Sequence, residues 1–213
     1  MDIGTGDRVI RRIAADQPWW LNLINLDDNC TYVERRLKIQ NLDAGRMKVV
    51  TIMQKRIDAE KIAGIVGTLY PSPFDLPCRT RERRKLGDAA GLTQFGVNLL
   101  ILPPGAWSSQ RHWHSESDEF VYVLSGEVTL VTDGGEEVLR AGDAAGFKAG
   151  DPNGHCLQNR SDAEVRVLEF GTRVPNDAAY YSDVDMFAPP GATAYTHRDG
   201  TPYENIRRRG PEV

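Results

Sequence analysis

The sequence has little of several features that would assign it to a familiar class. It has three cysteines in 213 residues, Cys30, Cys78 and Cys156. An odd number of widely spaced cysteines predicts no disulfide framework and favours a reducing, cytoplasmic location. No stretch approaches the ~18 consecutive apolar residues that a membrane-spanning helix needs, so we expect no membrane partner.

An excess of charge of one sign is also missing. The formal net charge is −4, and such a chain is not expected to bind nucleic acid through bulk electrostatics. The sequence contains no helix-turn-helix pattern, no glycine-rich phosphate loop and no nucleophile elbow. A hydrophobic content of 40% and a charged content of 26% indicate a globular protein with one good core.

Residues 1–54 form an N-terminal extension in which no chemistry is evident. A short amphipathic helix is expected around residues 9–14, and the rest shows no lasting periodicity. Two interpretations stay open. The segment is either a docking extension, which could be flexible, or a region that the native chain lacks, because Met53 could begin a shorter chain.

Residues 55–91 form a connector that carries a basic run at residues 79–85, Arg-Thr-Arg-Glu-Arg-Arg-Lys. Arginine side chains bind phosphate or carboxylate groups with two parallel hydrogen bonds, so one interpretation is an anion clamp. The other is a solvated strand or loop at the surface that offsets acidic neighbours. We favour the surface, because most charge runs are of this kind.

Short apolar alternations with glycine-containing turns predict a β-rich domain over residues 92–172. The expected strands are 95–102, 119–124, 127–132, 137–140, 144–147, 155–158 and 164–170. Many short strands without intervening helices predict an all-β sandwich or barrel. Residues 173–213 form a C-terminal tail with one ordered segment at 180–185.

Three of the four histidines are placed as metal ligands would be. His112 and His114 lie two residues apart, so on a strand they point to the same face. Glu119 follows closely, and His155 can approach from another strand. Alternation puts Asp118 on the face opposite to Glu119, as a rim carboxylate. Imidazoles with one carboxylate suit a divalent transition metal such as iron, manganese, nickel, zinc or copper.

Two segments of the sequence resemble the two cupin motifs. Residues 105–126 have a glycine, His-X-His, four further residues, a glutamate, and a glycine after six more. Residues 142–159 begin with Gly-Asp and end with His-X-X-X-Asn. The first segment has one extra residue before its histidines, and the second lacks the usual central proline and is two residues longer before its histidine.

Residues 57–203 are similar to a bacterial single-domain cupin group that is often labelled sugar-phosphate isomerase-like. The resemblance implies an antiparallel jelly-roll barrel of six to eight strands with a metal in its mouth, and frequently a homodimer. The metal ligands that it implies are His112, His114, Glu119 and His155.

Five other residues have weaker predictions. Gln110, two residues before a ligand, could bond a substrate or form an ordinary polar rim. Glu169 is a candidate buried acid or a partner of the metal ligands. His197 is expected at the surface, and Cys156 as a small buried hydrophobe. Trp113 should point away from the histidines into packing or a subunit interface.

Four protein ligands around an octahedral ion leave two open positions, as in a catalytic metal site. The predicted function is metal-dependent action on a small oxygen-rich molecule, a sugar, sugar phosphate or organic acid, by isomerase-like or dioxygenase-like chemistry. The alternative is a non-catalytic protein that binds oxalate or a sugar through the metal. An interior acid or base beyond the four ligands would favour the enzyme, and an apolar interior would favour the binding protein.

Overall fold

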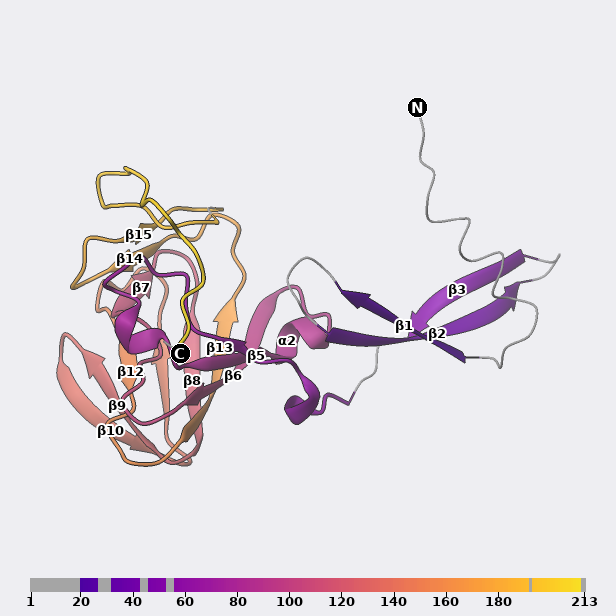
Figure 1. Cartoon of the computed structure of the whole chain (residues 1–213), viewed down its shortest axis with the longest axis horizontal. Coiled ribbons are helices and arrows are strands. Elements are labelled where there is room, and N and C mark those ends of the chain that lie inside the picture. The colour runs from indigo at the N-terminus through magenta and orange to yellow at the C-terminus, as the bar shows by residue number, and fades with distance from the viewer. Residues whose placement is uncertain (1–19, 27–31, 43–45, 53–55, 192, 212–213) are drawn as a thin grey trace. The chain divides into compact units, whose positions relative to one another are not determined.

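The computed structural model describes residues 20–26, 32–42, 46–52, 56–191 and 193–211 (Figure 1). The chain divides into two compact units, residues 1–57 and 58–213. In the first unit, three antiparallel strands pair in the order β1-β2-β3. These strands are β1 (Trp20–Leu26), β2 (Tyr32–Leu42) and β3 (Arg46–Ile52). The helix expected at residues 9–14 lies outside the described residues.

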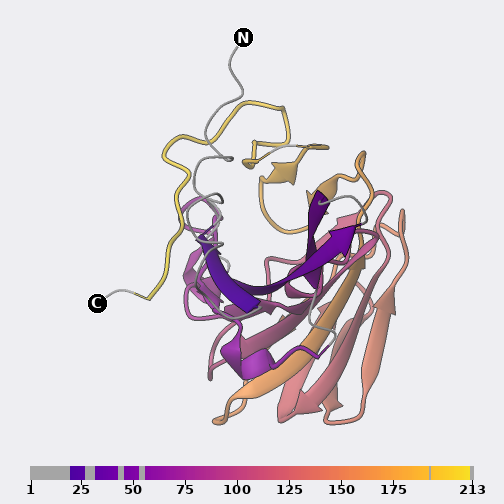
Figure 2. The ribbon, with the colours of Figure 1, turned by 90° about the vertical axis from the view of Figure 1, so that its right-hand side faces the viewer.

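The second unit contains three antiparallel sheets. The largest has six strands in the order β11-β8-β13-β6-β5-β4. Its strands are β4 (Ile65–Val66), β5 (Glu82–Lys85), β6 (Phe95–Leu102), β8 (Glu119–Ser125), β11 (Ala144–Phe147) and β13 (Val165–Thr172). In Figure 2 the pink and orange strands of this unit run side by side.

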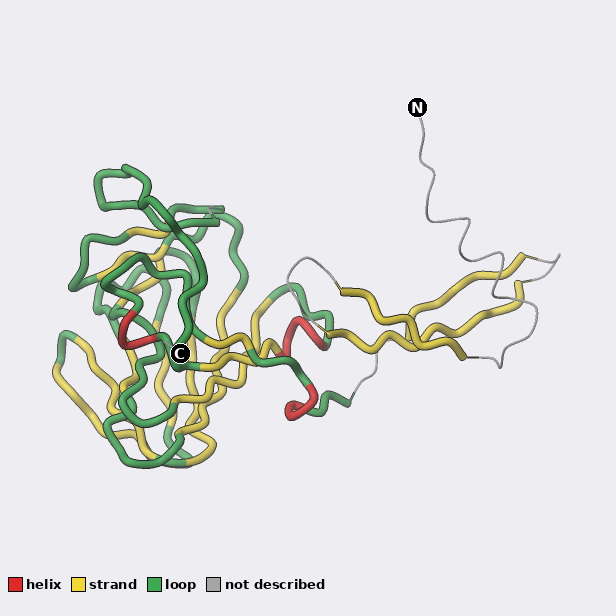
Figure 3. Tube along the Cα trace, viewed as in Figure 1, coloured by secondary structure: helices red, strands yellow, loops and turns green. Residues whose placement is uncertain are grey.

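The two smaller sheets have three strands each, in the orders β10-β9-β12 and β15-β14-β7. Their strands are β7 (His112–His114), β9 (Glu127–Thr132), β10 (Gly135–Arg140), β12 (Cys156–Gln158), β14 (Ala179–Tyr181) and β15 (Phe187–Ala188). Among the described residues, helix is confined to single turns (Figure 3), namely η1 (Ala59–Lys61), η2 (Leu76–Cys78) and α2 (Leu86–Ala89). Within the described residues, no helix has the length and apolar character needed to cross a bilayer.

The core lies between the six-stranded sheet and the β10-β9-β12 sheet. Because side chains alternate along a strand, Val121 and Val123 of β8 point into this core, as do two valines of β13. On β13, Val165 and Val167 are fully buried, and on β8 Val123 is fully buried. The opposite sheet contributes Val128, Leu130, Leu139 and Leu157. Each such side chain stabilises the fold by about 1.5–3 kcal/mol relative to an exposed one.

The predicted all-β, antiparallel fold is confirmed by this strand arrangement. Strand pairing extends beyond the expected barrel, residues 92–172, on both sides. Before it, β4 and β5 lengthen the six-stranded sheet, and after it β14 pairs with β7. The strand that carries His112 and His114 is therefore hydrogen-bonded to the C-terminal segment.

Candidate metal centre

Three segments bring the four predicted ligands together. His112 and His114 occupy the two ends of β7, and Glu119 is the first residue of β8. His155 directly precedes β12 and exchanges two backbone hydrogen bonds with His112, of 3.1 and 2.9 Å. A Cβ at position 154 would lie 2.1 Å from the Oγ of Ser182, so any larger residue there would require the serine side chain to move.

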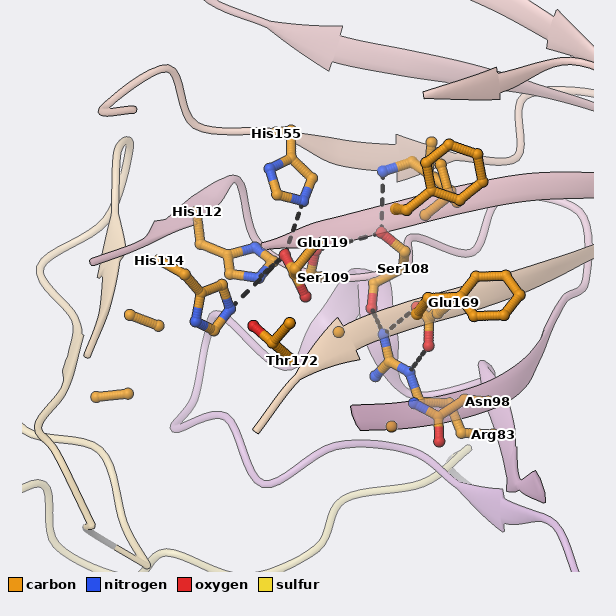
Figure 4. A pocket seen from close by; sticks show the side chains of 18 of the residues that line it. Arg83, Asn98, Ser108, Ser109, His112, His114, Glu119, His155, Glu169 and Thr172 are labelled. Atoms are coloured by element: carbon orange, nitrogen blue, oxygen red, sulfur yellow. Dashed lines mark hydrogen bonds and ion pairs between the residues drawn. The ribbon is translucent and has the colours of Figure 1, made fainter. Parts of the chain in front are cut away.

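One carboxylate oxygen is the point on which the three imidazoles converge (Figure 4). Oε2 of Glu119 lies 3.1 Å from Nε2 of His155. It lies 3.7 Å from Nε2 of His112 and 3.7 Å from Nε2 of His114. One donor atom each of His112, Glu119 and His155 lie within 4.8 Å of one another. His114 is outside this group of mutually close donors, although its Nε2 approaches the same carboxylate oxygen. Two nitrogens and one oxygen thus form the compact cluster, and the third imidazole lies beside it.

The hydrogen bonds of two rings assign their tautomers. Nδ1 of His112 lies 3.0 Å from the carbonyl oxygen of Gln110, and Nδ1 of His114 lies 2.5 Å from Oδ2 of Asp177. A carbonyl oxygen and an ionised carboxylate only accept, so in the neutral rings each Nδ1 carries the hydrogen and each Nε2 a lone pair. Both lone pairs face the buried Oε2 of Glu119, which receives no hydrogen bond of acceptable geometry from the described residues.

The ionisation states agree with a metal site. Burial lowers the pKa of His112 to about 3, which outweighs the opposing effect of Glu119. Burial raises the pKa of Glu119, but the neighbouring histidines outweigh it and lower the pKa to about 2. At neutral pH the ring is therefore neutral and the carboxylate is ionised, the forms that bind a metal. Because lone pairs repel one another, a cation at their centre fits this donor set.

Asp177 is a candidate site residue that the sequence did not reveal, because it contacts a predicted metal ligand, His114. Besides its bond to His114, it accepts hydrogen bonds from the backbone N–H groups of Glu116, at 2.9 Å, and Ser117, at 3.1 Å. Burial raises its pKa, but these hydrogen bonds outweigh burial, so the pKa is lower than usual. Its position in the predicted tail gave no signal, because Pro175-Asn176-Asp177 has the composition of an ordinary turn.

Two aromatic rings also hold the ligand histidines. Phe147 stacks on His155 with 3.4 Å between ring centroids and an angle of 2°. Tyr181 stacks on His112 with 5.6 Å between centroids and an angle of 21°. A carboxylate or a ring thus contacts every ligand imidazole, which restricts its rotation.

The four ligands open into a cavity of about 670 Å³ that also contains cationic and acidic side chains. Glu169, a predicted candidate, lines this cavity. Its two carboxylate oxygens accept hydrogen bonds of 2.7 Å each from Nε and Nη2 of Arg83. The same Nη2 donates to the carbonyl oxygen of Ser108 at 2.9 Å.

The favoured interpretation of the basic run as solvated surface is wrong for Arg81 and Arg83. Both line the cavity, and Arg81 is 6% exposed and donates to the backbone carbonyl of Ser108. The reason is topological, since β5 is paired on both sides, with β4 and with β6. Arg84 differs, because it pairs with Glu60 and Glu82 and does not line the cavity.

The remaining predicted residues are placed as follows. The amide of Gln110 donates to the carbonyl oxygen of Phe74 at 2.6 Å, and Gln110 is not among the residues that line the cavity. Trp113 stacks on Tyr180 with 4.4 Å between centroids, which confirms that it packs away from the ligands. Cys156 is buried, as predicted, and burial raises its pKa to about 11.

Two side chains near the surface also agree with their predictions. Asp118 is exposed and accepts a hydrogen bond from the backbone N–H of Ala149 at 2.8 Å. His197 is partly exposed, with Nδ1 2.8 Å from Oδ2 of Asp185, and does not line the cavity. Neither residue contributes to the group of donors around Glu119.

Comparison with known proteins places this architecture in a family. A family model described as the cupin domain matches residues 98–171. The crystal structure of a sugar phosphate isomerase from a cupin superfamily, from Silicibacter pomeroyi, is 46% identical, with a TM-score of 0.66. The match covers 72% of this chain and 99% of that one. The chain belongs to the cupin superfamily.

Other relatives of this cupin differ in length. Protein SchB of Streptomyces halstedii is 30% identical over 53% of the cupin chain and 88% of its own length. An uncharacterized oxidoreductase of Mycobacterium tuberculosis is 29% identical over 58% of the cupin chain. The cupin chain spans only 18% of the length of that oxidoreductase. The crystal structure of a candidate sugar phosphate isomerase from Acidithiobacillus ferrooxidans is 28% identical, with a TM-score of 0.52 over 61% of this chain and 80% of that one.

Proposed function

We propose that this cupin is a metal-dependent enzyme that acts on a small oxygen-rich molecule by isomerase-like chemistry. The observation that carries the proposal is the convergence of three Nε2 atoms on the carboxylate of Glu119 beside a cavity. His112, His114, Glu119 and His155 would hold one divalent transition metal. When bound, such a metal polarises a carbonyl or hydroxyl oxygen of the substrate.

The polar interior of the cavity favours an enzyme over a binding protein. Glu169 places a carboxylate in the cavity beyond the four ligands, with 18% of its side chain exposed. Arg83 fixes both of its oxygens, so the carboxylate has one defined orientation. We assign to Glu169 the role of the base that accepts and holds a substrate proton during isomerisation. This role requires the base to lie within hydrogen-bonding reach of that proton.

Sugars and sugar phosphates are the substrate classes that we favour. The 46% identity to the sugar phosphate isomerase of Silicibacter pomeroyi supports this choice. A sugar offers adjacent oxygens to two open metal positions, and it offers carbon-bound protons to a base. A homodimer and a cytoplasmic location remain predictions.

The experiment is a screen of metal-loaded protein with aldoses, ketoses and their phosphates in deuterated water. Isomerisation is expected to exchange a carbon-bound proton, which NMR detects, without dioxygen uptake at an oxygen electrode. Glu169→Gln should keep its metal and lose at least about 100-fold in turnover, the usual contribution of acid–base catalysis. Dioxygen uptake would point instead to an oxygenase. Binding without turnover in the wild-type protein would point to a binding protein.

A further inference from the structure

The inner face of the six-stranded sheet forms a floor without side chains next to Glu119. Across the strands, Glu119 on β8 pairs with Gly171 on β13, and Gly171 pairs with Gly96 on β6. Both glycines line the cavity. A Cβ on Gly171 would lie 3.9 Å from Cγ of Glu119. Space for a ligand therefore lies next to the carboxylate over Gly171, and over Gly96 it is bounded by the guanidinium of Arg173, whose Nε and Nη2 would lie 3.8 Å from a Cβ there.

Polar and cationic residues mark the far end of this floor. The neighbouring row of paired residues runs from Val121 through Glu169 and Asn98 to Lys85. Adjacent strands lie about 4.8 Å apart, so Asn98 and Lys85 are roughly 10 and 14 Å across the sheet from the strand of Glu119. A two-carbon acid such as oxalate is too short for this span, whereas a phosphorylated sugar chain can extend along it.

The donors at the far end are not all used within the protein. Arg83 directs Nε and Nη2 at Glu169, and no described residue accepts a hydrogen bond from its Nη1. Figure 4 shows Asn98 next to Arg83, and among the described residues the side-chain amide of Asn98 has no hydrogen-bond partner. The side chain of Lys85 is 39% exposed, with Nζ 3.7 Å from the carboxylate of Asp88.

We propose that Arg83, Lys85 and Asn98 bind the phosphate group of a sugar phosphate whose sugar oxygens face the metal ligands. The proposal rests on the function proposed above and adds the position of the phosphate and the direction of the substrate. A phosphomonoester carries up to two negative charges and three acceptor oxygens, and so matches a lysine, an arginine and an amide that line one cavity better than a planar carboxylate does. Arg173, which also lines the cavity, adds positive charge beside Asp88.

The first test compares three ligands by calorimetry on the metal-loaded full-length protein: glucose 6-phosphate, glucuronate and glucose. Glucose 6-phosphate should bind at least about tenfold more tightly than the other two, as expected when a charge-assisted contact is gained. Equal binding of glucose would overturn the phosphate subsite. Equal binding of glucuronate would overturn its preference for phosphate over carboxylate.

The second test removes single charges. Lys85→Gln should weaken the binding of glucose 6-phosphate about tenfold, with unchanged metal content and unchanged affinity for glucose. The matched control is Arg84→Gln, on the same strand but outside the cavity, which should change the affinity less than twofold. Equal losses in both variants would show a general charge effect and contradict the subsite.

A third test keeps the two proposals separable. Arg83→Gln alone leaves Glu169 unpaired, so the Arg83→Gln/Glu169→Gln double variant is used, and it should also lose about tenfold in affinity for glucose 6-phosphate. His114→Ala should lose metal yet still bind inorganic phosphate, with an affinity that Lys85→Gln reduces. Metal retention in His114→Ala would overturn the metal site alone. Phosphate binding that Lys85→Gln leaves unchanged would overturn the subsite alone.

Discussion

Asp177→Ala should weaken metal binding by about 10- to 100-fold, the usual effect of losing a partner that orients a metal ligand. In the wild-type protein the carboxylate lies 2.5 Å from Nδ1 of His114. It therefore keeps the hydrogen on Nδ1 and leaves Nε2 free to bind the metal. Without it, the neutral ring can place its hydrogen on Nε2 or turn away, and each of these states must be reversed before metal binds.

The expected loss of folding stability follows from the other contacts of the Asp177 carboxylate. Its other oxygen accepts hydrogen bonds from the N–H groups of Glu116 and Ser117, each worth about 1 kcal/mol of stability. Water can replace part of this, because Glu116 is exposed, so Asp177→Ala should fold. Asp177→Asn keeps an oxygen that can accept from His114 and should lose less affinity than Asp177→Ala.

The assay is a competition titration of metal against a chromophoric chelator, with circular dichroism melting as the check of folding. Asp185→Ala is the matched control, since Asp185 also accepts from a histidine, His197, at 2.8 Å and from a backbone N–H, that of Arg198. It should change metal affinity less than twofold. Wild-type affinity in a folded Asp177→Ala protein would refute the role of this carboxylate.

Three further predictions concern stability and organisation. Burial lowers the pKa of His112 from 6.5 to about 3, so between these pH values the unfolded state binds more protons than the folded state. The unfolding free energy of the metal-free protein should therefore fall as the pH drops from about 6.5 to 3. A His112→Gln variant whose unfolding free energy, from urea titrations, has the same pH dependence would contradict this. Gly126→Ala should destabilise the protein by at least about 1–2 kcal/mol, because φ is +79° there and a Cβ would lie 3.0 Å from the carbonyl oxygen of Glu164. An unchanged melting midpoint in this variant would argue against the predicted strain. A chain that begins at Met53 should stay soluble and keep its metal, because residues 58–213 form a unit of their own; aggregation or metal loss would show that the extension is needed.

Alternation and turn chemistry were enough to predict much of the fold. The segments 95–102, 127–132 and 144–147 were expected as strands and coincide with β6, β9 and β11. In β9 and β11 the residues that enter the core are apolar, and β6 ends in the buried apolar run Leu99–Leu102, so the apolar pattern of these strands is visible in the sequence. The segment of β5 was left open between a solvated strand and a loop, because its inward side chains are Arg83 and Lys85, which a cavity accommodates and a dry core would not.

The candidate site was only partly predictable from the sequence, because local spacing reveals only contacts between residues that are close along the chain. His112, His114 and Glu119 lie within eight positions of one another, so local spacing places them together. Asp177 lies 63 residues from His114, and only the pairing of β14 with β7 brings it there. Gln110 was expected to continue the alternation of β7, but this strand begins at His112 and the backbone before it turns.

The central claim is that three imidazoles and one carboxylate share a single cation. Elemental analysis after loading with manganese, iron or zinc and removal of excess ion measures this most directly. One metal per wild-type chain is expected, and much less in His114→Ala, while His197→Ala, the histidine outside the cavity, should keep the full amount. No retained metal in the wild-type protein, or equal metal in His114→Ala, would contradict the account.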